Sequence, residues 1–220
     1  MEGQHFSTAR WPYLVTSENG CVLAINGDYA CGRYSMKNAK VGILIRDGKI
    51  FWSKTKPSTY SGFPNLDCLA VYPDGRMEVY DSDEKTAEEY IDMGVSQVYS
   101  FGPWMIRDGM INDDVYRFGK ENAPRTALGM VEPGHYWAVM LEGRHKESKG
   151  ASIAWMTELM QSKGCTVAFN LDGGETSVIC FMGKQICTVG GANNAAGNAR
   201  RESEFLYIGT SSLVEGYIGN

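Results

Sequence analysis

The sequence predicts an α+β fold, in which one hairpin-rich domain has mostly antiparallel or mixed sheet and two main helices. Short β-rich runs recur along the chain, and Asx-Gly or Gly-containing turns separate them. Two other segments have apolar residues at helical spacing. No linker or internal repeat of domain length interrupts the 220 residues. We therefore expect one domain over residues 1–220, with an ample core.

The predicted strands lie on both sides of short turns. The first is the apolar run at 21–27, which ends at Asn-Gly. Hairpins are predicted around Asp47-Gly48, Asp74-Gly75, Asp108-Gly109 and Gly183-Lys184. Because an Asx-Gly pair forms a turn whatever the protein does, we assign no function to these turns.

Helices are predicted at 83–94 and 152–164. The first has acidic residues in its first turn and ends at a glycine. In the second, Ser152 is a candidate N-cap and Gly164 a candidate C-cap, and the Met and Trp residues are interpreted as core. The β-branched run at 165–170 then predicts a buried central strand.

Composition excludes several classes of protein. The net charge is -5, the pI is about 5.3, and no run of Lys and Arg is longer than two residues, so no nucleic-acid partner is expected. No apolar stretch approaches the roughly 20 residues of a membrane-spanning helix. No signal-peptide pattern opens the sequence, which predicts a cytoplasmic protein if the sequence is complete and leaves open the soluble part of a longer exported one.

Cysteine and motif patterns narrow the chemistry further. The six cysteines are irregularly spaced, without a CxxC pair, and are interpreted as small buried hydrophobes, although disulfides stay open. GxSxG, HExxH and P-loop motifs are absent from the sequence, which argues against α/β-hydrolases, common zinc proteases and P-loop nucleotide hydrolases. Two weakly patterned segments, 53–67 and 190–203, are predicted loops of a length that is often functional.

Polar clusters at the ends of predicted strands are the candidate functional residues. They are Asn26 and Asp28; Arg125 and Thr126; Glu142 and Arg144; and Asn170, Asp172, Gly173, Gly174, Glu175, Thr176 and Ser177. The last group surrounds a Gly-Gly pair, which lets a ligand approach the main chain and can present N–H groups to an anion. The alternative is a wide hairpin turn with its acids in solvent. Arg125 is a candidate fork donor to phosphate or carboxylate, or else a salt-bridged surface residue.

Four segments of the sequence, three of which contain these candidate residues, together resemble a known family. In order, they are "LAINGDY", "FGPWMIRDG", "PRTALG" with the later "LEGRHKESKGASI", and "FNLDGGETSV". They resemble the phosphodiester glycosidases, with exported bacterial members looking most similar, over about residues 21–208. Family members usually have strands before the first segment, which leaves open an incomplete amino-terminal edge. The resemblance also implies a location outside the cytoplasm if a leader precedes this sequence.

The resemblance implies hydrolysis of a sugar-1-phosphodiester, in which the anomeric C–O bond breaks to give a free sugar and a phosphomonoester. Asp172 is then the carboxylate that acts as base or nucleophile, or that steadies an oxocarbenium ion. Arg125 and Arg144 are implied phosphate clamps. Asn26 and Asn170 are implied to hold sugar hydroxyls or to orient Asp172.

The resemblance also implies substrate contacts by three hydroxyl side chains, by the two loop glycines and by a late arginine. These residues are Thr126, Thr176, Ser177, Gly173, Gly174 and Arg201.

Three positions depart from the family pattern and bear on the substrate more than on the fold. Glu175 replaces a third glycine and would either add an acid or block the pocket. Asp28 stands where many members have glycine or an aromatic residue, and Glu142 replaces an aspartate. With Asp172, these acids form the implied catalytic set.

The expected substrate is a cell-surface or exopolysaccharide glycan. Two alternatives stay open: a non-catalytic carbohydrate- or phosphoglycan-binding module on the same fold, and a phosphodiesterase that cleaves P–O. No cofactor is required by the pattern, but Asp28, Asp172 and Glu175 could hold a divalent cation if they converge. The sequence does not predict the oligomeric state.

Overall fold

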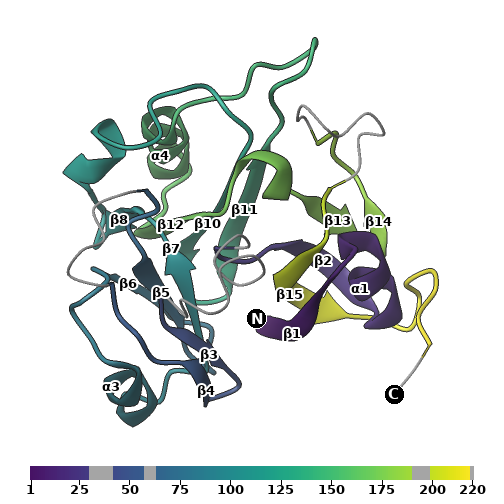
Figure 1. Cartoon of the computed structure of the whole chain (residues 1–220), viewed down its shortest axis with the longest axis horizontal. Helices are drawn as coiled ribbons and strands as arrows, with labels where there is room; N and C mark the ends of the chain where they lie inside the picture. Colours follow the sequence, from purple (N-terminus) through teal and green to yellow (C-terminus); the bar gives the residue numbers. More distant parts are fainter. Residues whose placement is uncertain (30–41, 57–62, 190–198, 219–220) are drawn as a thin grey trace.

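The structure is a computed structural model that describes residues 1–29, 42–56, 63–189 and 199–218. Cys31 and parts of the two predicted loops, 57–62 and 190–198, lie outside the described residues. The described chain forms three five-stranded antiparallel sheets. Figure 1 shows how the labelled strands and helices are arranged. The predicted α+β class with hairpin-rich antiparallel sheet is therefore confirmed.

The first sheet joins the two ends of the chain and has the order β1-β15-β2-β13-β14. Its strands are β1 (Glu2–Arg10), β15 (Glu202–Thr210), β2 (Cys21–Asn26), β13 (Ile179–Phe181) and β14 (Lys184–Gln185). Helix α1 (Pro12–Glu18) packs on β2, β13 and β14. β2 lies between β15 and β13, so its carboxyl end enters the middle of the molecule.

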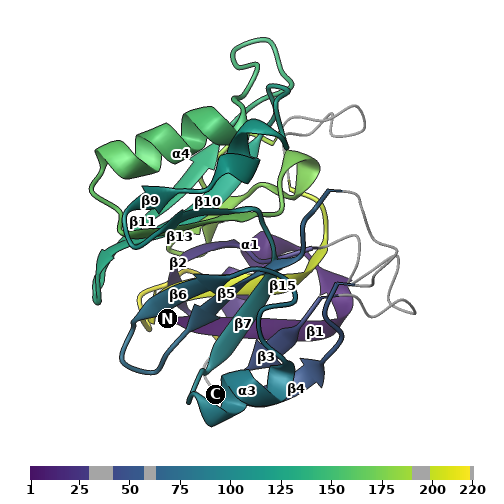
Figure 2. The ribbon, with the colours of Figure 1, turned by 90° about the vertical axis from the view of Figure 1, so that its left-hand side faces the viewer.

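The second sheet has the order β4-β3-β7-β5-β6. Its strands are β3 (Leu44–Arg46), β4 (Lys49–Trp52), β5 (Asp67–Val71), β6 (Met77–Tyr80) and β7 (Gln97–Phe101). Helix α3 (Ala87–Asp92) covers the outer side of this sheet (Figure 2). Thr86 and Glu89 form a capping box at its start, which satisfies backbone N–H groups that the first turn leaves unpaired.

The third sheet carries most of the candidate site and has the order β11-β10-β12-β8-β9. Its strands are β8 (Trp104–Arg107), β9 (Met110–Ile111), β10 (Arg125–Glu132), β11 (His135–Leu141) and β12 (Val167–Leu171). Helix α4 (Ile153–Ser162) packs on it, and the Ser152 hydroxyl accepts a hydrogen bond from the Trp155 N–H (3.2 Å) at the predicted N-cap. Short 3-10 turns, η1 (Asp113–Tyr116) and η2 (Gly174–Thr176), complete this part.

One apolar core lies between the three sheets. Its buried residues come from all of them: Ile25 and Leu206; Leu69, Val71, Met77, Val79, Tyr99 and Phe101; and Leu128, Met130, Val167, Phe169 and Leu171. Smaller apolar clusters lie under α3 and α4 on the outer sides. The sheets therefore meet through a shared interior, which brings the ends of β2 and β12 close together.

The predicted turns and helices appear with small shifts at their ends. Asp47-Gly48 and Asp108-Gly109 join β3 to β4 and β8 to β9, with both residues of each pair at positive φ. The sequence reading missed β1 and α1. The described cysteines Cys165 and Cys180 are buried free thiols, as small apolar side chains would be. No helix among the described residues is long and apolar enough to cross a membrane.

Candidate active site

A cavity of about 350 Å³ brings together three arginines and three acids. It lies where β10 begins and β12 ends. Its lining residues are Phe63, Phe101, Glu121, Ala123, Arg125, Arg144, Asp172, Gly173, Gly174, Glu175 and Arg200. Six residues predicted from the sequence thus share one cavity: Arg125, Arg144, Asp172, Gly173, Gly174 and Glu175.

Asn26 fixes the loop that carries Asp172. This residue is fully buried at the end of β2, and its Nδ2 donates a hydrogen bond to the Asp172 carbonyl (2.9 Å). Its Oδ1 accepts one from the Val178 N–H (3.1 Å). One amide side chain therefore ties both ends of the loop 172–178 to the first sheet. Of the two roles considered for Asn26, the structure shows the contacts of a residue that orients Asp172.

Asp172 follows β12 directly and lines the cavity, and only 8% of the residue is exposed. Its Oδ1 accepts a hydrogen bond from the Gly173 N–H (2.8 Å), and its Oδ2 lies 3.5 Å from Nη2 of Arg200. Both contacts stabilise the ionised carboxylate. The geometry therefore presents the Asp172 carboxyl group to the cavity, beside a backbone N–H and a guanidinium.

Arg125 is buried at the start of β10 and held from one side. Its Nε donates to the Ala151 carbonyl, while Nη2 donates to the carbonyls of Gly119 and Glu121 and to the Glu121 carboxylate. Burial, helped by the nearby Arg144, lowers the pKa of the guanidinium, and Glu121 opposes this. Nη1 donates to none of the described residues and remains available to a ligand.

Arg144 lines the same cavity and has no hydrogen-bond or ion-pair partner within the described parts of the chain. Its backbone is left-handed, with φ at 59°. Gly174, also left-handed at φ 66°, makes room for it, because a Cβ at Gly174 would lie 3.0 Å from Arg144 Nη1. The glycine pair therefore serves close approach to an arginine as well as the turn.

Glu175 is half-buried and lines the cavity. It is the first acid of the 3-10 turn η2 and lies beside the two glycines.

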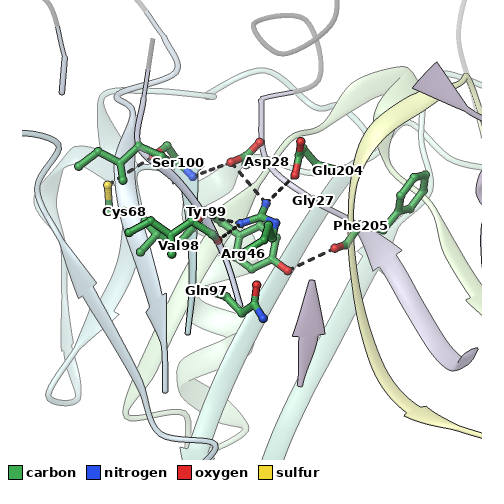
Figure 3. Close-up of polar contacts among 12 residues, drawn as sticks. Gly27, Asp28, Arg46, Cys68, Gln97, Val98, Tyr99, Ser100, Glu204 and Phe205 are labelled. Carbon is green, nitrogen blue, oxygen red and sulfur yellow. Dashed lines mark hydrogen bonds and ion pairs between the residues drawn. The ribbon is translucent and has the colours of Figure 1, made fainter. Parts of the chain in front are cut away.

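Asp28 lies outside this cavity, in a buried ion cluster between the first and second sheets (Figure 3). Its Oδ2 accepts a hydrogen bond from the Ser100 N–H (2.9 Å) and lies 4.0 Å from Nη2 of Arg46. The same nitrogen lies 2.7 Å from Glu204 Oε2, and the guanidinium lies 3.8 Å above the Tyr99 ring. Asp28 is 1% exposed and does not line the cavity of Asp172, so its predicted catalytic role stays untested.

Glu142 also lies outside the cavity. Its Oε1 accepts a hydrogen bond from the Thr188 N–H (2.6 Å), and its Oε2 lies 3.4 Å from His145 Nε2. It lines a neighbouring cavity on the other side of the bridge between Ala123 and Ala151. In this structure its contacts join loops.

Four more predicted residues are fully buried behind the cavity wall. Thr126, Asn170, Thr176 and Ser177 show 0% exposure and do not line the cavity. Asn170 donates to the Gly102 carbonyl (2.8 Å), while its Oδ1 and the three hydroxyls have no hydrogen-bond partner among the residues described. A buried polar atom without a partner is costly, so these atoms mark places for water or for a group that enters the site.

Arg200, rather than Arg201, is the late arginine that lines the cavity. The Arg201 side chain is exposed, and its guanidinium lies 5.2 Å above the Trp11 ring. The Arg-Arg pair at 200–201 indicates an arginine near the site, but the sequence does not show which of the two faces the cavity, because that depends on the register of β15. The sequence analysis did not predict three other lining residues, Phe63, Phe101 and Glu121.

The described residues contain no group of three or more His, Cys, Asp or Glu side chains placed to hold a metal. Asp28, in the ion cluster, does not line the cavity of Asp172 and Glu175. A divalent cation at this site stays an untested prediction.

Comparison with known proteins shows which family the sequence matches. A family model described as phosphodiester glycosidase matches residues 19–208. A curated relative, the SPbeta prophage-derived uncharacterized protein YomE of Bacillus subtilis (strain 168), is 30% identical over 149 residues, which cover 66% of this chain and 22% of the relative. The chain thus matches only about a fifth of that relative's length.

Three solved structures share the fold. The catalytic domain of zebrafish N-acetylglucosamine-1-phosphodiester alpha-N-acetylglucosaminidase, auto-inhibited by its pro-peptide, has a TM-score of 0.71 at 18% identity, over 92% of this chain and 67% of that one. A putative exported protein of Burkholderia pseudomallei K96243 has a TM-score of 0.61 at 11% identity, over 94% and 70%. A hypothetical protein from Synechocystis has a TM-score of 0.58 at 12% identity, over 93% and 55%. At these identities the structures show the fold alone, whereas the family model matches most of the sequence: the chain belongs to the phosphodiester glycosidase family.

Proposed function

We propose that this chain hydrolyses a sugar-1-phosphodiester at the anomeric C–O bond, with Asp172 acting at the sugar and the cavity arginines binding the phosphate. The observation that carries the proposal is the grouping of Asp172 with Arg125, Arg144 and Arg200 in one cavity. Family membership supports the same reaction class.

The arginines suit a phosphodiester anion. Arg144 has no partner among the described residues, and Nη1 of Arg125 is unoccupied by them. Both guanidiniums can therefore bind phosphate oxygens without giving up an existing contact. Guanidinium is also the side-chain group whose fork geometry best matches phosphate.

The leaving group makes a strong general acid unnecessary. A phosphomonoester has a second pKa near 6, so it departs with little protonation. The demand then falls on the sugar carbon, where a carboxylate acts as nucleophile or as base for water and stabilises positive charge on the ring. Water supplies the oxygen that ends on the sugar and the proton that is released.

We place the substrate among cell-surface or exopolysaccharide glycans that contain phosphodiester-linked sugars. Asp172 and Glu175, rather than Asp28 and Glu142, are the candidate catalytic acids that the cavity brings together.

Asp172→Asn tests the proposal on the purified protein. The isosteric amide removes the charge, so kcat for a sugar-1-phosphodiester should fall roughly 10²–10⁴-fold while the thermal midpoint stays near that of the wild type. Asp83→Asn, at an exposed carboxylate distant in sequence, is the control and should retain full activity. Near-normal turnover by Asp172→Asn would refute the assignment.

Glu175 favours one second candidate, a non-catalytic phosphoglycan-binding module, because its side chain lies in the cavity. Under that reading, the wild type binds the phosphodiester without turning it over, and Glu175→Gly gains turnover. Measurable turnover by the wild type would exclude the binding module. A large loss in Glu175→Gly would make this acid part of the catalytic machinery.

A further inference from the structure

Glu202 is a buried carboxyl that the proposed mechanism does not use. It is the first residue of β15 and is 1% exposed. Neither carboxyl oxygen has a hydrogen-bond partner among the described residues. An ionised carboxylate in such a place is strongly disfavoured, and the group becomes neutral by keeping its proton.

The groups that face Glu202 come from several elements. Asp172 follows β12, Arg200 precedes β15, Cys180 lies in β13, and Cys187 follows β14. Burial first, and then the charge of Asp172, raise the pKa of Glu202 well above its ordinary value, and Arg200 opposes this only in part. Burial also raises the pKa of the Cys180 thiol to about 12 and that of Cys187 above its usual range, so both thiols are uncharged near neutral pH.

Asp172 has a different environment, although the charge of Arg200 acts on both acids. It faces the cavity, accepts the Gly173 N–H and lies 3.5 Å from the Arg200 guanidinium. Two acids whose surroundings favour opposite protonation states form a functional pair in many active sites. Here only one of them reaches the cavity.

We propose that Glu202 is a positioning residue of this site, which stands as an uncharged carboxylic acid behind Asp172 and so leaves Arg200 to Asp172 and the substrate anion. This inference rests on the proposed function and adds a requirement to it. If Glu202 loses its proton to solvent, a second negative charge appears behind the cavity. That charge repels the phosphodiester and competes with Asp172 for Arg200.

The consequence is a loss of anion binding as the pH rises through the raised pKa of Glu202. Glu202→Gln keeps the shape of the neutral acid and cannot ionise. Glu202→Met keeps the length and is also uncharged, which provides a second variant if the amide disturbs folding. Glu132→Gln, at an exposed acid on the far end of β10, is the matched control.

The test measures binding of sulfate by calorimetry from acidic to alkaline pH, because sulfate keeps its charge over this range and needs no turnover. Wild type and Glu132→Gln should lose affinity as the pH rises from the ordinary pKa of a glutamic acid through the raised pKa of Glu202, and both Glu202 variants should lose less. With a sugar-1-phosphodiester, the same split should appear in KM rather than in kcat. Thermal midpoints complete the set: the wild type should lose stability relative to Glu202→Gln as the pH rises.

The outcomes separate the inference from the proposed function. Equal pH dependence of sulfate affinity in wild type and Glu202→Gln overturns the inference. So does a folded Glu202→Gln that binds no sulfate at any pH, since a charge or proton on Glu202 would then be required. Sulfate binding without turnover by the wild type removes the hydrolase proposal but leaves this test intact. If the wild type binds no sulfate, the phosphate site fails, and parallel midpoints for wild type and Glu202→Gln then overturn the inference as well.

Discussion

The buried cluster around Arg46 gives the sharpest stability prediction. Arg46 Nη2 lies 2.7 Å from Glu204 Oε2, and the two side chains are 4% and 1% exposed. Nη1 donates to the carbonyls of Ile45 and Val98 at 2.7 and 2.6 Å. Arg46→Met would keep much of the side-chain volume but remove the buried guanidinium that lies 2.7 Å from Glu204 and 4.0 Å from Asp28.

The magnitude follows from burial. Removing one member of a buried ion pair costs about 3–5 kcal/mol, because the remaining charge is left uncompensated. In a chain of this size, each kcal/mol shifts the thermal midpoint by about 2–4 °C, so Arg46→Met should lower it by roughly 6–20 °C. Thermal unfolding followed by circular dichroism measures the shift. The double variant Arg46→Met with Glu204→Gln should recover part of the loss, since it also removes the buried carboxylate that lies nearest to Arg46.

An exposed ion pair of the same length is the control. Lys184 Nζ lies 2.6 Å from Glu215 Oε2, but the side chains are 69% and 74% exposed. Lys184→Met should leave the midpoint unchanged within error, because solvent already screens this pair. Equal shifts for Lys184→Met and Arg46→Met, or a shift below 2 °C for Arg46→Met, would refute the argument that burial sets the cost.

Two further predictions concern pH and a glycine. Burial is the main cause that raises the pKa of Asp67 to about 7 from 3.8. Because the folded state binds this proton more tightly, the free energy of unfolding of the wild type, relative to Asp67→Asn, should be highest below pH 4. It should fall by on the order of 4 kcal/mol between pH 4 and 7; a pH-independent difference would contradict the shift. Gly174→Ala should cost about 1–2 kcal/mol of stability and raise KM for the phosphodiester, since its φ is 66° and its Cβ would lie 3.0 Å from Arg144. Gly94→Ala, at φ 78° with no atom within 4 Å of its Cβ, has the same backbone cost and should leave KM unchanged, whereas similar kinetics in both variants would exclude displacement of Arg144.

Local chemistry made much of the fold predictable. An Asx-Gly pair such as Asp47-Gly48 fixes its turn through its own backbone preferences, and a capped helix such as α4 carries its start and stop signals within a few residues. The amino-terminal helix α1 was missed although Pro12 stands at its first turn, because a seven-residue helix leaves little periodicity to read.

Long-range contacts set the parts that sequence could not place. Asn26 contacts the carbonyl of Asp172, 146 positions away, and only the pairing of three sheets brings them together. Asp28 was predicted to be a site acid, but its carboxylate lies 4.0 Å from the guanidinium of Arg46, which belongs to β3 of another sheet. The same limit explains why Arg201 was favoured over Arg200 and why Glu202 gave no signal: neither strand register nor desolvation is visible in a single sequence.

The central claim is C–O cleavage of a sugar-1-phosphodiester at the cavity of Asp172. Hydrolysis of such a substrate in oxygen-18 water, followed by mass spectrometry of both products, tests it most directly. The account predicts that the label enters the sugar with the wild type and that Asp172→Asn releases almost no labelled sugar. Label in the phosphomonoester would show P–O cleavage instead and would contradict the account.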